Sequence, residues 1–336
     1  MKRKSTSSGR ERVTLRTIAN AAKVSLMTVS YALRNSSQVS TGERSRIQGI
    51  AESLGYRPDP LLTHLMQHLR SHHTPKSATN LAVLTMLGAP FVRRLIDGAL
   101  VRAGRLGYHL DEIDVRAYLS KPDALTRMLQ ARGIFGVLLA PTADPANYSE
   151  LLDWTRFAAV AMTYSIVEPH VHRVVTHHFD NAVRTFTLLE QQGYSRIGLA
   201  MTHDMEFRAN HSYSGAYYRM TSMDGLKALP ILYLDNTSRP GIRAWFTQHR
   251  PQVVIVANSH QVHDFMVPGL TQRQRDRIAF RSLDYEKQAG IPGIDQLFET
   301  IGSHAVDTLV AQIHRNERGL PENPTVTMVK GRWVEA

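Results

Sequence analysis

The side chains near the amino terminus that are best suited to chemistry open a short predicted helix, in the run Ser25-Leu26-Met27-Thr28. Ser25 can cap this helix, with Thr28 three residues further on. The residues that recur at the spacing of a buried face are Val29, Ala32 and Leu33. The positions left outside are Leu26, Met27, Ser30, Tyr31 and Arg34. An outward-facing Leu, Met and Tyr are unusual on a helix surface, and together with the hydroxyl groups beside them they indicate a binding face whose partner depends on the surrounding elements.

The sequence offers little for bond-making chemistry. It contains no Cys, which excludes disulfides, Cys-ligated zinc and thiol catalysis. It also lacks a G-x-S-x-G elbow, a P-loop, an H-E-x-x-H motif and a G-x-G-x-x-G turn after a strand. The pairs His177-His178 and His170-x-His172 have no nearby nucleophile and base, and we interpret them as loop or surface histidines. We therefore predict a protein that is not an enzyme and needs no cofactor or metal. Because some binding-protein folds do host catalysis, a turnover assay would distinguish a binder from an enzyme.

Positive charge is concentrated at the amino terminus. The chain has 336 residues and a net charge of +11, and most of the excess of Lys and Arg lies in residues 1–76. A basic segment on a nearly neutral body suits a polyanion partner, although a solvated basic tail would have the same composition. No apolar run reaches the roughly 18 residues of a membrane span, and no signal peptide follows the basic start. We therefore expect a cytoplasmic protein without membrane contact.

Two further helices are predicted around the first. Thr14 can cap a helix whose buried stripe is Leu15, Ile18, Ala19 and Ala22. After the short turn and the helix opened by Ser25, a capping box from Ser40 to Glu43 begins another helix. Its stripe is Ile47, Ile50, Ala51 and Leu54, before Gly55 at a position that favours positive φ. Three short amphipathic helices joined by tight turns predict a helix-turn-helix module.

The run VTLRTIANAAKVSLMTVSYALRNSSQVSTGERSRIQGIAESLGYRPDP resembles the DNA-binding domain of the LacI/GalR family of bacterial transcription regulators, without gaps over nearly fifty residues. The resemblance implies that Leu26 and Met27 occupy the two base-reading positions. It further implies phosphate or base contacts from Thr14, Ser25, Thr28, Ser30 and Asn35. Ordinary helix surface is the alternative interpretation of Thr28 and Ser30.

Two residues depart from the family pattern. Lys23 replaces the usual Gly in the turn, and a non-Gly residue at positive φ costs about 1 kcal/mol. Tyr31 replaces a common Arg, so a bidentate donor is exchanged for an aromatic face and one hydroxyl. We expect a slightly less stable domain and an altered base preference.

Residues 59–76 are predicted to form a hinge helix and linker. Pro58 and Pro60 end the preceding helix, and apolar residues then recur at helical spacing from 61 to 69. The resemblance implies that Leu65 wedges into the minor groove of the operator; packing of Leu65 on the body is the alternative. His64 and His68 have no carboxylate or Cys beside them, so a metal site is not expected.

The remaining residues, 77–336, alternate strand-like apolar runs with helical patterns, which predicts parallel sheets flanked by helices. The expected strands are 81–86, 134–140, 158–162, 197–201, 253–257 and 278–283, with helices over 91–106 and 182–192. The weaker resemblance here implies a two-subdomain body like that of periplasmic binding proteins. The fold class is therefore a small all-α helix-turn-helix domain, 13–58, after a basic tail, 1–12, and before this α/β effector-binding and dimerisation domain.

Five positions match effector-contacting residues of the family: Phe91, Arg208, Asn258, Asp284 and Gln296. An Arg and an Asp on opposite sides of a cleft would suit a polyhydroxylated ligand, so we predict a sugar or sugar derivative. Ala89 replaces an Asn beside Phe91, and Ser259 replaces an Asp beside Asn258, which leaves room for an unusual ligand or none.

Together these features predict a homodimeric, sequence-specific DNA-binding regulator, a repressor that binds a palindromic operator on double-stranded DNA and is controlled by a small-molecule effector. The alternatives are a member that lacks effector control or activates transcription, and a solute-binding protein that does not regulate DNA. The basic amino terminus argues against the last of these.

Overall fold

The computed structural model describes residues 13–33, 36, 38–56, 80–86, 88–223, 226–257 and 266–335. Three of the predicted site residues, Asn35, Leu65 and Asn258, and the whole predicted hinge lie outside the described residues. The chain divides into two compact units. One contains Met1–Ala78 and Ala311–Arg318, and the other contains Thr79–Val310 and Gly319–Ala336.

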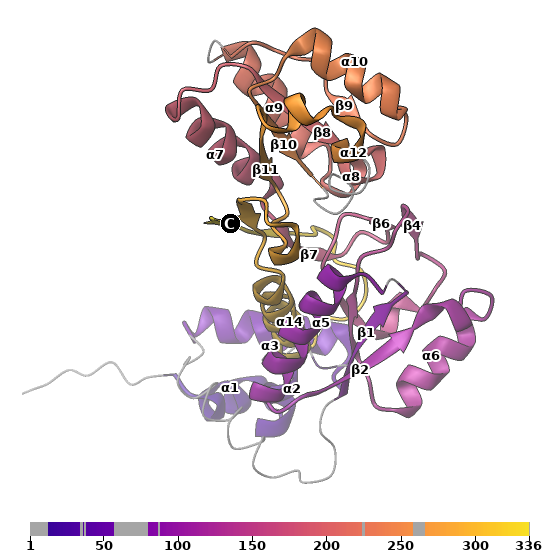
Figure 1. Ribbon diagram of the computed structural model, residues 1–336. Helices are drawn as coiled ribbons and strands as arrows, with labels where there is room; N and C mark the ends of the chain where they lie inside the picture. The colour runs from indigo at the N-terminus through magenta and orange to yellow at the C-terminus, as the bar shows by residue number, and fades with distance from the viewer. Residues whose placement is uncertain are drawn as a thin grey trace, which may run out of the picture. The chain divides into compact units, whose positions relative to one another are not determined.

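The first unit contains the three predicted helices, α1 (Leu15–Ala22), α2 (Leu26–Leu33) and α3 (Thr41–Ser53), drawn in indigo in Figure 1. Their apolar stripes meet in one core whose fully buried side chains are Ile18, Val29, Ala32 and Ile47. Since each helix has only two to four turns, packing of these stripes rather than intrinsic helix propensity stabilises the unit.

Local capping follows the sequence closely. Thr14 accepts a hydrogen bond from the backbone N–H of Thr17 and forms a capping box with it. Lys23 has φ of 54°, so a lysine does occupy the left-handed position that the family usually gives to Gly. Ser40 accepts from the N–H of Glu43, but the predicted reciprocal bond is absent because the Glu43 carboxylate pairs with Arg46 at 2.6 Å.

Side chains of α3 bind backbone carbonyls elsewhere in the unit. Arg46 donates to the carbonyl of Ala22 at 3.0 Å, and Gln48 donates to the carbonyl of Ala32 at 3.0 Å. Both acceptors lie in the last turn of a helix, where carbonyls have no intrahelical partner. These contacts fix the ends of α1 and α2 against α3.

Two predictions about exposure in this unit are wrong. Leu54, assigned to the buried stripe of the third helix, is 37% exposed because α3 ends at Ser53 and Leu54 forms its C-cap. Tyr31, expected to lie outside, is half-buried and packs against the core. An aromatic ring at this position therefore has a packing role that an Arg would not fill in the same way.

The second unit contains two sheets. The first has the strand order β13-β7-β5-β3-β1-β2, with all pairings parallel. Its strands are β1 (Asn80–Thr85), β2 (His109–Asp114), β3 (Gly136–Leu139), β5 (Ala158–Ala161), β7 (His172–Thr176) and β13 (Val326–Val329), accompanied by α5 (Pro90–Arg105) and α6 (Pro122–Ala131). Strands β4 (Ala146–Asn147) and β6 (Ile166–Glu168) form a separate two-stranded sheet.

The second sheet has the order β14-β12-β11-β10-β8-β9, in which only β14 runs antiparallel to its neighbour. Its strands are β8 (Ile197–Met201), β9 (Leu232–Tyr233), β10 (Val253–Val256), β11 (Ala279–Ser282), β12 (Gly293–Asp295) and β14 (Arg332–Val334). The helices between them are α7 (His178–Gln191), α8 (His203–Arg208), α9 (Ser212–Met223), α10 (Arg239–His249), α12 (Val267–Gly269) and α13 (Gln272–Arg275), and short 3-10 turns cover Val115–Ala117, Trp154–Arg156 and Lys287–Ala289.

The six predicted strands all correspond to observed strands, and the two-subdomain α/β prediction is confirmed. The strands that the sequence did not reveal include β2 and β12. The β2 sequence His109–Asp114 is mostly polar because it lies at a sheet edge, and β12 has only three residues. Buried central strands are visible as apolar runs, whereas edge and very short strands are not.

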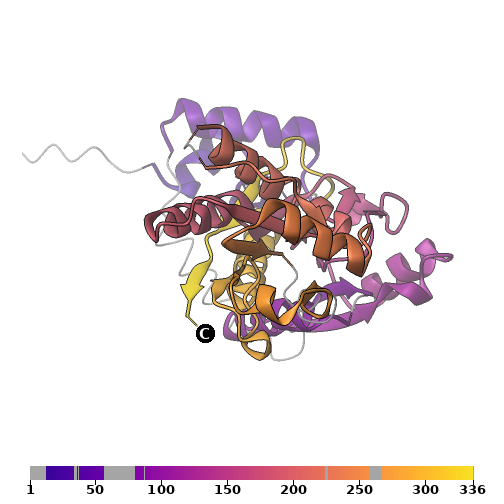
Figure 2. The same cartoon turned by 45° about the horizontal axis from the view of Figure 1, so that its top comes forward.

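The chain crosses between the two sheets after β7, after β12 and after β13. Figure 1 shows the resulting two lobes, magenta and orange, and Figure 2 turns the second lobe toward the viewer. The crossing after β12 leads into α14 (Phe298–Arg315), whose first turns pack on α5 of the first lobe. Residues next to these crossings can therefore contact both lobes.

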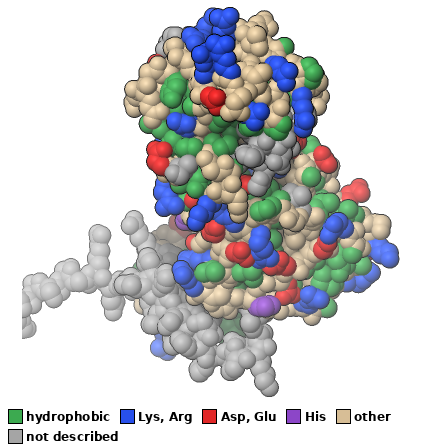
Figure 3. Space-filling view, viewed as in Figure 1, with side chains coloured by type: hydrophobic (Ala, Val, Ile, Leu, Met, Phe, Trp, Pro, Cys, Tyr) green, Lys and Arg blue, Asp and Glu red, His purple; other side chains and the backbone are tan. Residues whose placement is uncertain are grey.

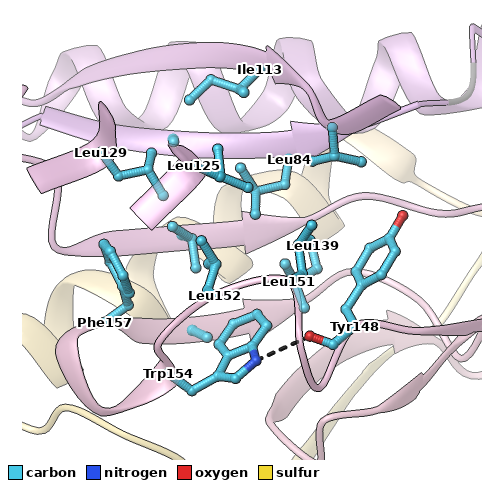
Figure 4. Close-up of a cluster of buried hydrophobic side chains, with 14 of the residues drawn as sticks. Leu84, Ile113, Leu125, Leu129, Leu139, Tyr148, Leu151, Leu152, Trp154 and Phe157 are labelled. Carbon is cyan, nitrogen blue, oxygen red and sulfur yellow. Dashed lines mark hydrogen bonds between the residues drawn. The ribbon is translucent and has the colours of Figure 1, made fainter. Parts of the chain in front are cut away.

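The core of the first lobe is a cluster of leucines and aromatic rings between its sheet and α6 (Figure 4). The indole N–H of Trp154 donates to the Tyr148 carbonyl at 3.0 Å, which satisfies the one polar atom of a buried ring. This lobe therefore has its own packed interior, and the junction of the lobes is not needed to bury it.

Helices α5 and α14 cross at two glycines. A Cβ added at Gly302 would lie 1.9 Å from the carbonyl oxygen of Leu95, and one at Gly98 would lie 2.0 Å from that of Glu299. Only residues without a Cβ allow the two backbones to approach so closely.

Gly302→Ala is expected to lower the free energy of unfolding of the second unit by about 2–3 kcal/mol, because the clash is with backbone and both helices must shift. Chemical denaturation followed by circular dichroism measures this change. Gly104→Ala in α5, where an added Cβ meets nothing within 4 Å, is the matched control and should stabilise by about 0.5–1 kcal/mol. Equal effects of the two changes would contradict the close crossing.

Candidate DNA-binding surface and ligand cavity

The start of α2 presents the two predicted base-reading side chains to solvent. Leu26 is 49% exposed and Met27 is 64% exposed, although both are large and apolar. The hydroxyls of Ser25 and Thr28 are 2.8 Å apart, and the backbone N–H of Thr28 donates to Ser25 at 3.0 Å. Ser25 thus holds the helix start while Leu26 and Met27 project from it, which is the arrangement needed for reading base edges.

The other predicted DNA contacts are distributed around this surface. Thr14 is exposed at the start of α1 and its hydroxyl lies 3.0 Å from that of Thr17. Ser30 is half-buried on α2 and Tyr31 packs inward. The roles of these residues toward DNA stay predictions.

A cavity of about 90 Å³ lies in the second unit, several times the roughly 10–15 Å³ that one water occupies. It is lined by residues of both lobes and of the crossings after β7 and β12. Four of the five predicted effector residues, Phe91, Arg208, Asp284 and Gln296, are among the lining residues. The other residues that line it are Leu95, Pro141, Met162, Thr163, Tyr164, Val175, Thr176, His178, Met205, Glu286, Phe298 and Ile301. The cavity is therefore mostly apolar, with a few polar groups, as small-molecule sites usually are.

Aromatic rings form one wall of the cavity. Phe91 in the first turn of α5 and Phe298 at the start of α14 have ring centroids 5.5 Å apart, tilted by 44°. The guanidinium carbon of Arg208 lies 6.0 Å from the Phe91 centroid, and that of Arg94 lies 5.3 Å from the Phe298 centroid. These contacts bring a residue of the second lobe, Arg208, against an aromatic wall supplied by the α5 and α14 helices.

Arg208 is only partly engaged by protein groups. Its Nη2 donates to Asp204 at 2.8 Å, one turn earlier in α8, and its side chain is 16% exposed. Its Nε is buried without a hydrogen-bond partner among the described residues. A buried donor without a partner costs roughly 1–3 kcal/mol, so this Nε–H is suited to a ligand acceptor.

Asp284 follows β11, and one of its carboxylate oxygens accepts from the Ser282 hydroxyl at 2.9 Å. Arg208 and Asp284 both belong to the second lobe, since β8 and β11 lie in the same sheet. The expectation that they face each other across the cleft is therefore wrong. Among the described residues, the first lobe contributes only uncharged side chains to the lining, namely Phe91, Leu95, Pro141, Met162, Thr163, Tyr164, Val175 and Thr176.

Gln296, in the crossing after β12, has its amide bound by the protein. It accepts from the Thr176 hydroxyl at 3.0 Å and donates to the Leu283 carbonyl at 2.8 Å and to the Tyr213 hydroxyl at 3.2 Å. These bonds connect both lobes. Its predicted contact with an effector stays a prediction, but its polar groups hold the junction together.

The sequence missed His178, which lines the cavity directly after β7. The interpretation as a loop or surface histidine is wrong for this residue. Its Nδ1 lies 2.9 Å from the Tyr213 hydroxyl, and the two rings meet edge to face at 5.1 Å. Its position immediately after a parallel strand is the signal that could have found it.

Burial perturbs both partners of this contact. Burial lowers the pKa of His178 to about 3, assisted by the charges of His177 and Arg208. Burial also raises the pKa of Tyr213 well above its ordinary value, and the Asp284 carboxylate adds to this effect. At neutral pH both side chains are therefore uncharged.

The depressed pKa of His178 makes the stability of the second unit depend on pH. The unfolded chain binds a proton at His178 near pH 6.5 and the folded chain does not, so stability is complete above pH 6.5 and falls as pH decreases toward 3. The slope from this one group approaches 1.4 kcal/mol per pH unit.

His178→Asn should flatten the fall in melting temperature of the second unit between pH 6.5 and 4.5, and His109→Gln on the exposed β2 edge serves as the control. An unchanged slope in His178→Asn would contradict the burial of His178.

Other features of the second unit do not suggest further chemistry. Among the described residues, no three His, Asp or Glu side chains are grouped so that they could hold a metal ion. None of the helices in the described ranges is long and apolar enough to cross a membrane. On the face drawn in Figure 3, basic and acidic side chains are interspersed over the lobes, in keeping with the nearly neutral charge of this part of the sequence.

Sequence comparison identifies the first unit. Residues 14–59 match the family of bacterial regulatory proteins, lacI family. The transcriptional repressor CytR of Escherichia coli K12 is 28% identical over 188 residues, which cover 55% of this chain and 52% of that protein. The transcriptional repressor PurR of Aliivibrio salmonicida is 22% identical over 218 residues, covering 65% and 63% of the two chains. The matched region thus spans about half the length of CytR.

Solved structures share the fold over nearly the whole chain. A regulator CelR in complex with cellobiose superposes with a TM-score of 0.60 at 18% identity, covering 96% of this chain and 98% of the other. A lac repressor dimer bound to operator and the anti-inducer ONPF gives a TM-score of 0.55 at 18% identity, covering 97% and 98%.

The chain therefore combines a helix-turn-helix unit, with Leu26 and Met27 exposed, and a two-lobed α/β unit whose cavity is lined by both lobes, and this fold is shared by the solved structures above. Within this architecture, the segment 14–59 matches the family of bacterial regulatory proteins, lacI family.

Proposed function

We propose that this protein is a sequence-specific DNA-binding transcriptional repressor whose affinity for its operator is controlled by a small molecule. The observation that carries the proposal is the lacI-family match of residues 14–59, in which Leu26 and Met27 project from the start of α2. The segments proposed for this function are a basic tail, 1–12, the DNA-binding domain, 13–58, the hinge and linker, 59–76, and the effector-binding and dimerisation domain, 77–336.

Two DNA-binding domains of a homodimer would contact successive major-groove half-sites of a palindrome, because operator symmetry follows protein symmetry. Because the proposed partner is DNA, we also propose that the protein acts in the cytoplasm. Turnover of a bound compound is not part of the proposal.

The direct test is selection of genomic fragments by the purified full-length protein at two salt concentrations. A palindrome shared by the fragments retained at the higher salt supports sequence-specific regulation. Fragments without a common sequence, lost as salt rises, would reduce the interaction to nonspecific phosphate binding and contradict the proposal.

Replacing Leu26 and Met27 together by Ala should reduce the preference for the selected palindrome over random DNA by about 1–3 kcal/mol for each base pair whose contact is lost. The dependence of affinity on salt should stay the same, because neither side chain neutralises a phosphate. Fluorescence anisotropy with both duplexes measures the two quantities. The control is Arg16→Ala on the exposed face of α1, which should lower the salt dependence of affinity if Arg16 contacts a phosphate. A lower salt dependence in the variant with Ala at Leu26 and Met27 would contradict base reading.

For the effector we propose a small polyhydroxylated compound such as a sugar, bound in the cavity between the lobes. The aromatic wall of Phe91 and Phe298 suits a ring face, Arg208 supplies a donor, and Asp284 supplies an acceptor. The cellobiose complex of the structurally similar CelR supports this ligand class. A screen of sugars, including cellobiose, for release of the selected duplex tests the effector; a screen in which no compound changes DNA affinity would favour a member without effector control.

A further inference from the structure

A continuous series of hydrogen bonds joins the two crossings that border the cavity. The Thr176 hydroxyl donates to Gln296 Oε1 at 3.0 Å, and Gln296 Nε2 donates to the carbonyl of Leu283 at 2.8 Å. The orientation of the amide is fixed by Leu283, because a carbonyl can only accept and the amide oxygen could not take the place of Nε2. The same Nε2 is 3.2 Å from the Tyr213 hydroxyl, which must therefore accept.

This series favours one of the two neutral tautomers of His178. The Tyr213 hydroxyl has one proton, and among the described hydrogen bonds His178 Nδ1, 2.9 Å away, is the acceptor available to it, so the hydroxyl is expected to donate to Nδ1. Nδ1 is then an acceptor, so the neutral imidazole holds its proton on Nε2. Burial, which lowers the pKa of His178, keeps the ring neutral at physiological pH.

The Nε2–H group of His178 is the end of the series. His178 lines the cavity, and its described hydrogen bond is made by Nδ1 alone. Arg208, whose charge is close enough to lower the pKa of His178, lines the same cavity with its unpartnered Nε–H. Both residues line the space that an effector would occupy, and each has an N–H group without a hydrogen-bond partner among the described residues.

We propose that His178 is a specificity-determining residue that donates a hydrogen bond from Nε2 to an oxygen acceptor of a neutral effector, an inference that rests on the proposed function for the effector's role. The acceptor is a hydroxyl or carbonyl oxygen rather than a carboxylate, because Asp284 and Glu286 line the same cavity and the charge of the lining arginine, Arg208, is already paired with Asp204. A hydroxyl satisfies both kinds of residue, since it accepts from His178 and donates to a carboxylate.

The tautomer is tested on the free full-length protein, without DNA or effector. Long-range nitrogen–proton NMR of the histidine rings, with the His178 signals assigned by their loss in His178→Gln, should show protonated Nε2 and unprotonated Nδ1. Tyr213→Phe removes the donor to Nδ1 and should produce a mixture of tautomers. Protonated Nδ1 in the unaltered protein would overturn the proposal, whatever the protein's action on DNA.

The donor role is tested with the sugar that releases the selected duplex in the screen above, by calorimetry on three variants. His178→Gln places an amide N–H near the position of Nε2 and should bind that sugar within about threefold of the original affinity. His178→Asn retains an acceptor for Tyr213 but does not reach the cavity as far, and should bind about 10-fold more weakly, the effect of one hydrogen bond of roughly 1.4 kcal/mol. His178→Phe should be at least as weak as His178→Asn.

A purely structural role for His178 would reverse this order, because His178→Asn would then preserve binding and His178→Gln would lose it; that result would overturn the proposal. The melting temperature of each variant shows whether the second unit remains folded. If the protein binds its operator but no sugar changes that binding, the effector part of the proposed function is wrong. The NMR measurement of the His178 tautomer does not depend on that result.

Discussion

Ile47→Ala is expected to unfold the first unit while the second unit stays folded. Ile47 is fully buried in the core where α1, α2 and α3 meet. Truncating a buried Ile costs about 2–5 kcal/mol, and the three packed helices, which occupy roughly forty residues of the first unit, have a stability of only about 2–6 kcal/mol. The loss therefore equals most or all of what holds the unit together.

The measurement is DNA binding together with thermal unfolding. Specific DNA binding should be abolished, and the melting transition of the second unit should remain within about 1 °C because no residue of its sheets is altered. Ile50→Ala is the matched control, since Ile50 lies on the same helix with the same side chain but is half-buried. We expect it to cost about 1 kcal/mol and to leave binding measurable. Loss of the second unit's transition in Ile47→Ala would show that the units do not fold separately.

Arg208→Ala is expected to remove the response to the effector without changing affinity for the operator. The variant removes the buried Nε–H donor, a charged contact with the Phe91 ring and the ion pair with Asp204. A hydrogen bond from a charged group contributes about 1.5–3 kcal/mol, so the sugar concentration needed for release should rise about 10- to 150-fold.

The control for Arg208→Ala is Arg116→Ala, which removes an exposed arginine paired with Asp114 outside the cavity. It should leave both operator affinity and the response to sugar unchanged, because exposed ion pairs contribute little. A normal response in Arg208→Ala would show that the effector binds elsewhere. A loss of operator affinity without sugar would show that Arg208 acts on the DNA-binding state itself.

Coupling between the two functions has a thermodynamic limit. If a sugar lowers affinity for the operator, the operator lowers affinity for the sugar by the same factor, and such couplings are typically about 1–3 kcal/mol. The cavity is bordered by residues on both lobes and on the crossings after β7 and β12, so a ligand there can favour one arrangement of the lobes over another.

The three helices of the first unit and six strands of the two sheets could be predicted from local sequence patterns. Caps, turns and helical stripes depend on residues three or four positions apart, and the exposed Leu26 and Met27 follow from the stripe that buries Val29 and Ala32. Apolar runs likewise indicate central strands that are buried on both faces. The prediction failed at Leu54, because the apolar spacing of the sequence continues to this residue whereas helix α3 ends at Ser53.

The polar chemistry of the cavity could not be predicted from the sequence, because it depends on contacts between distant parts of the folded chain. Arg208 and Asp284 proved to share a lobe, and the amide of Gln296 proved to be engaged by Thr176, 120 positions earlier, and Tyr213, 83 positions earlier. The state of His178 depends on the same contacts. No local sequence pattern contains this information. The hydrogen-bond partners depend on which strand ends lie close together in the fold, and the protonation of a buried ring depends on those partners.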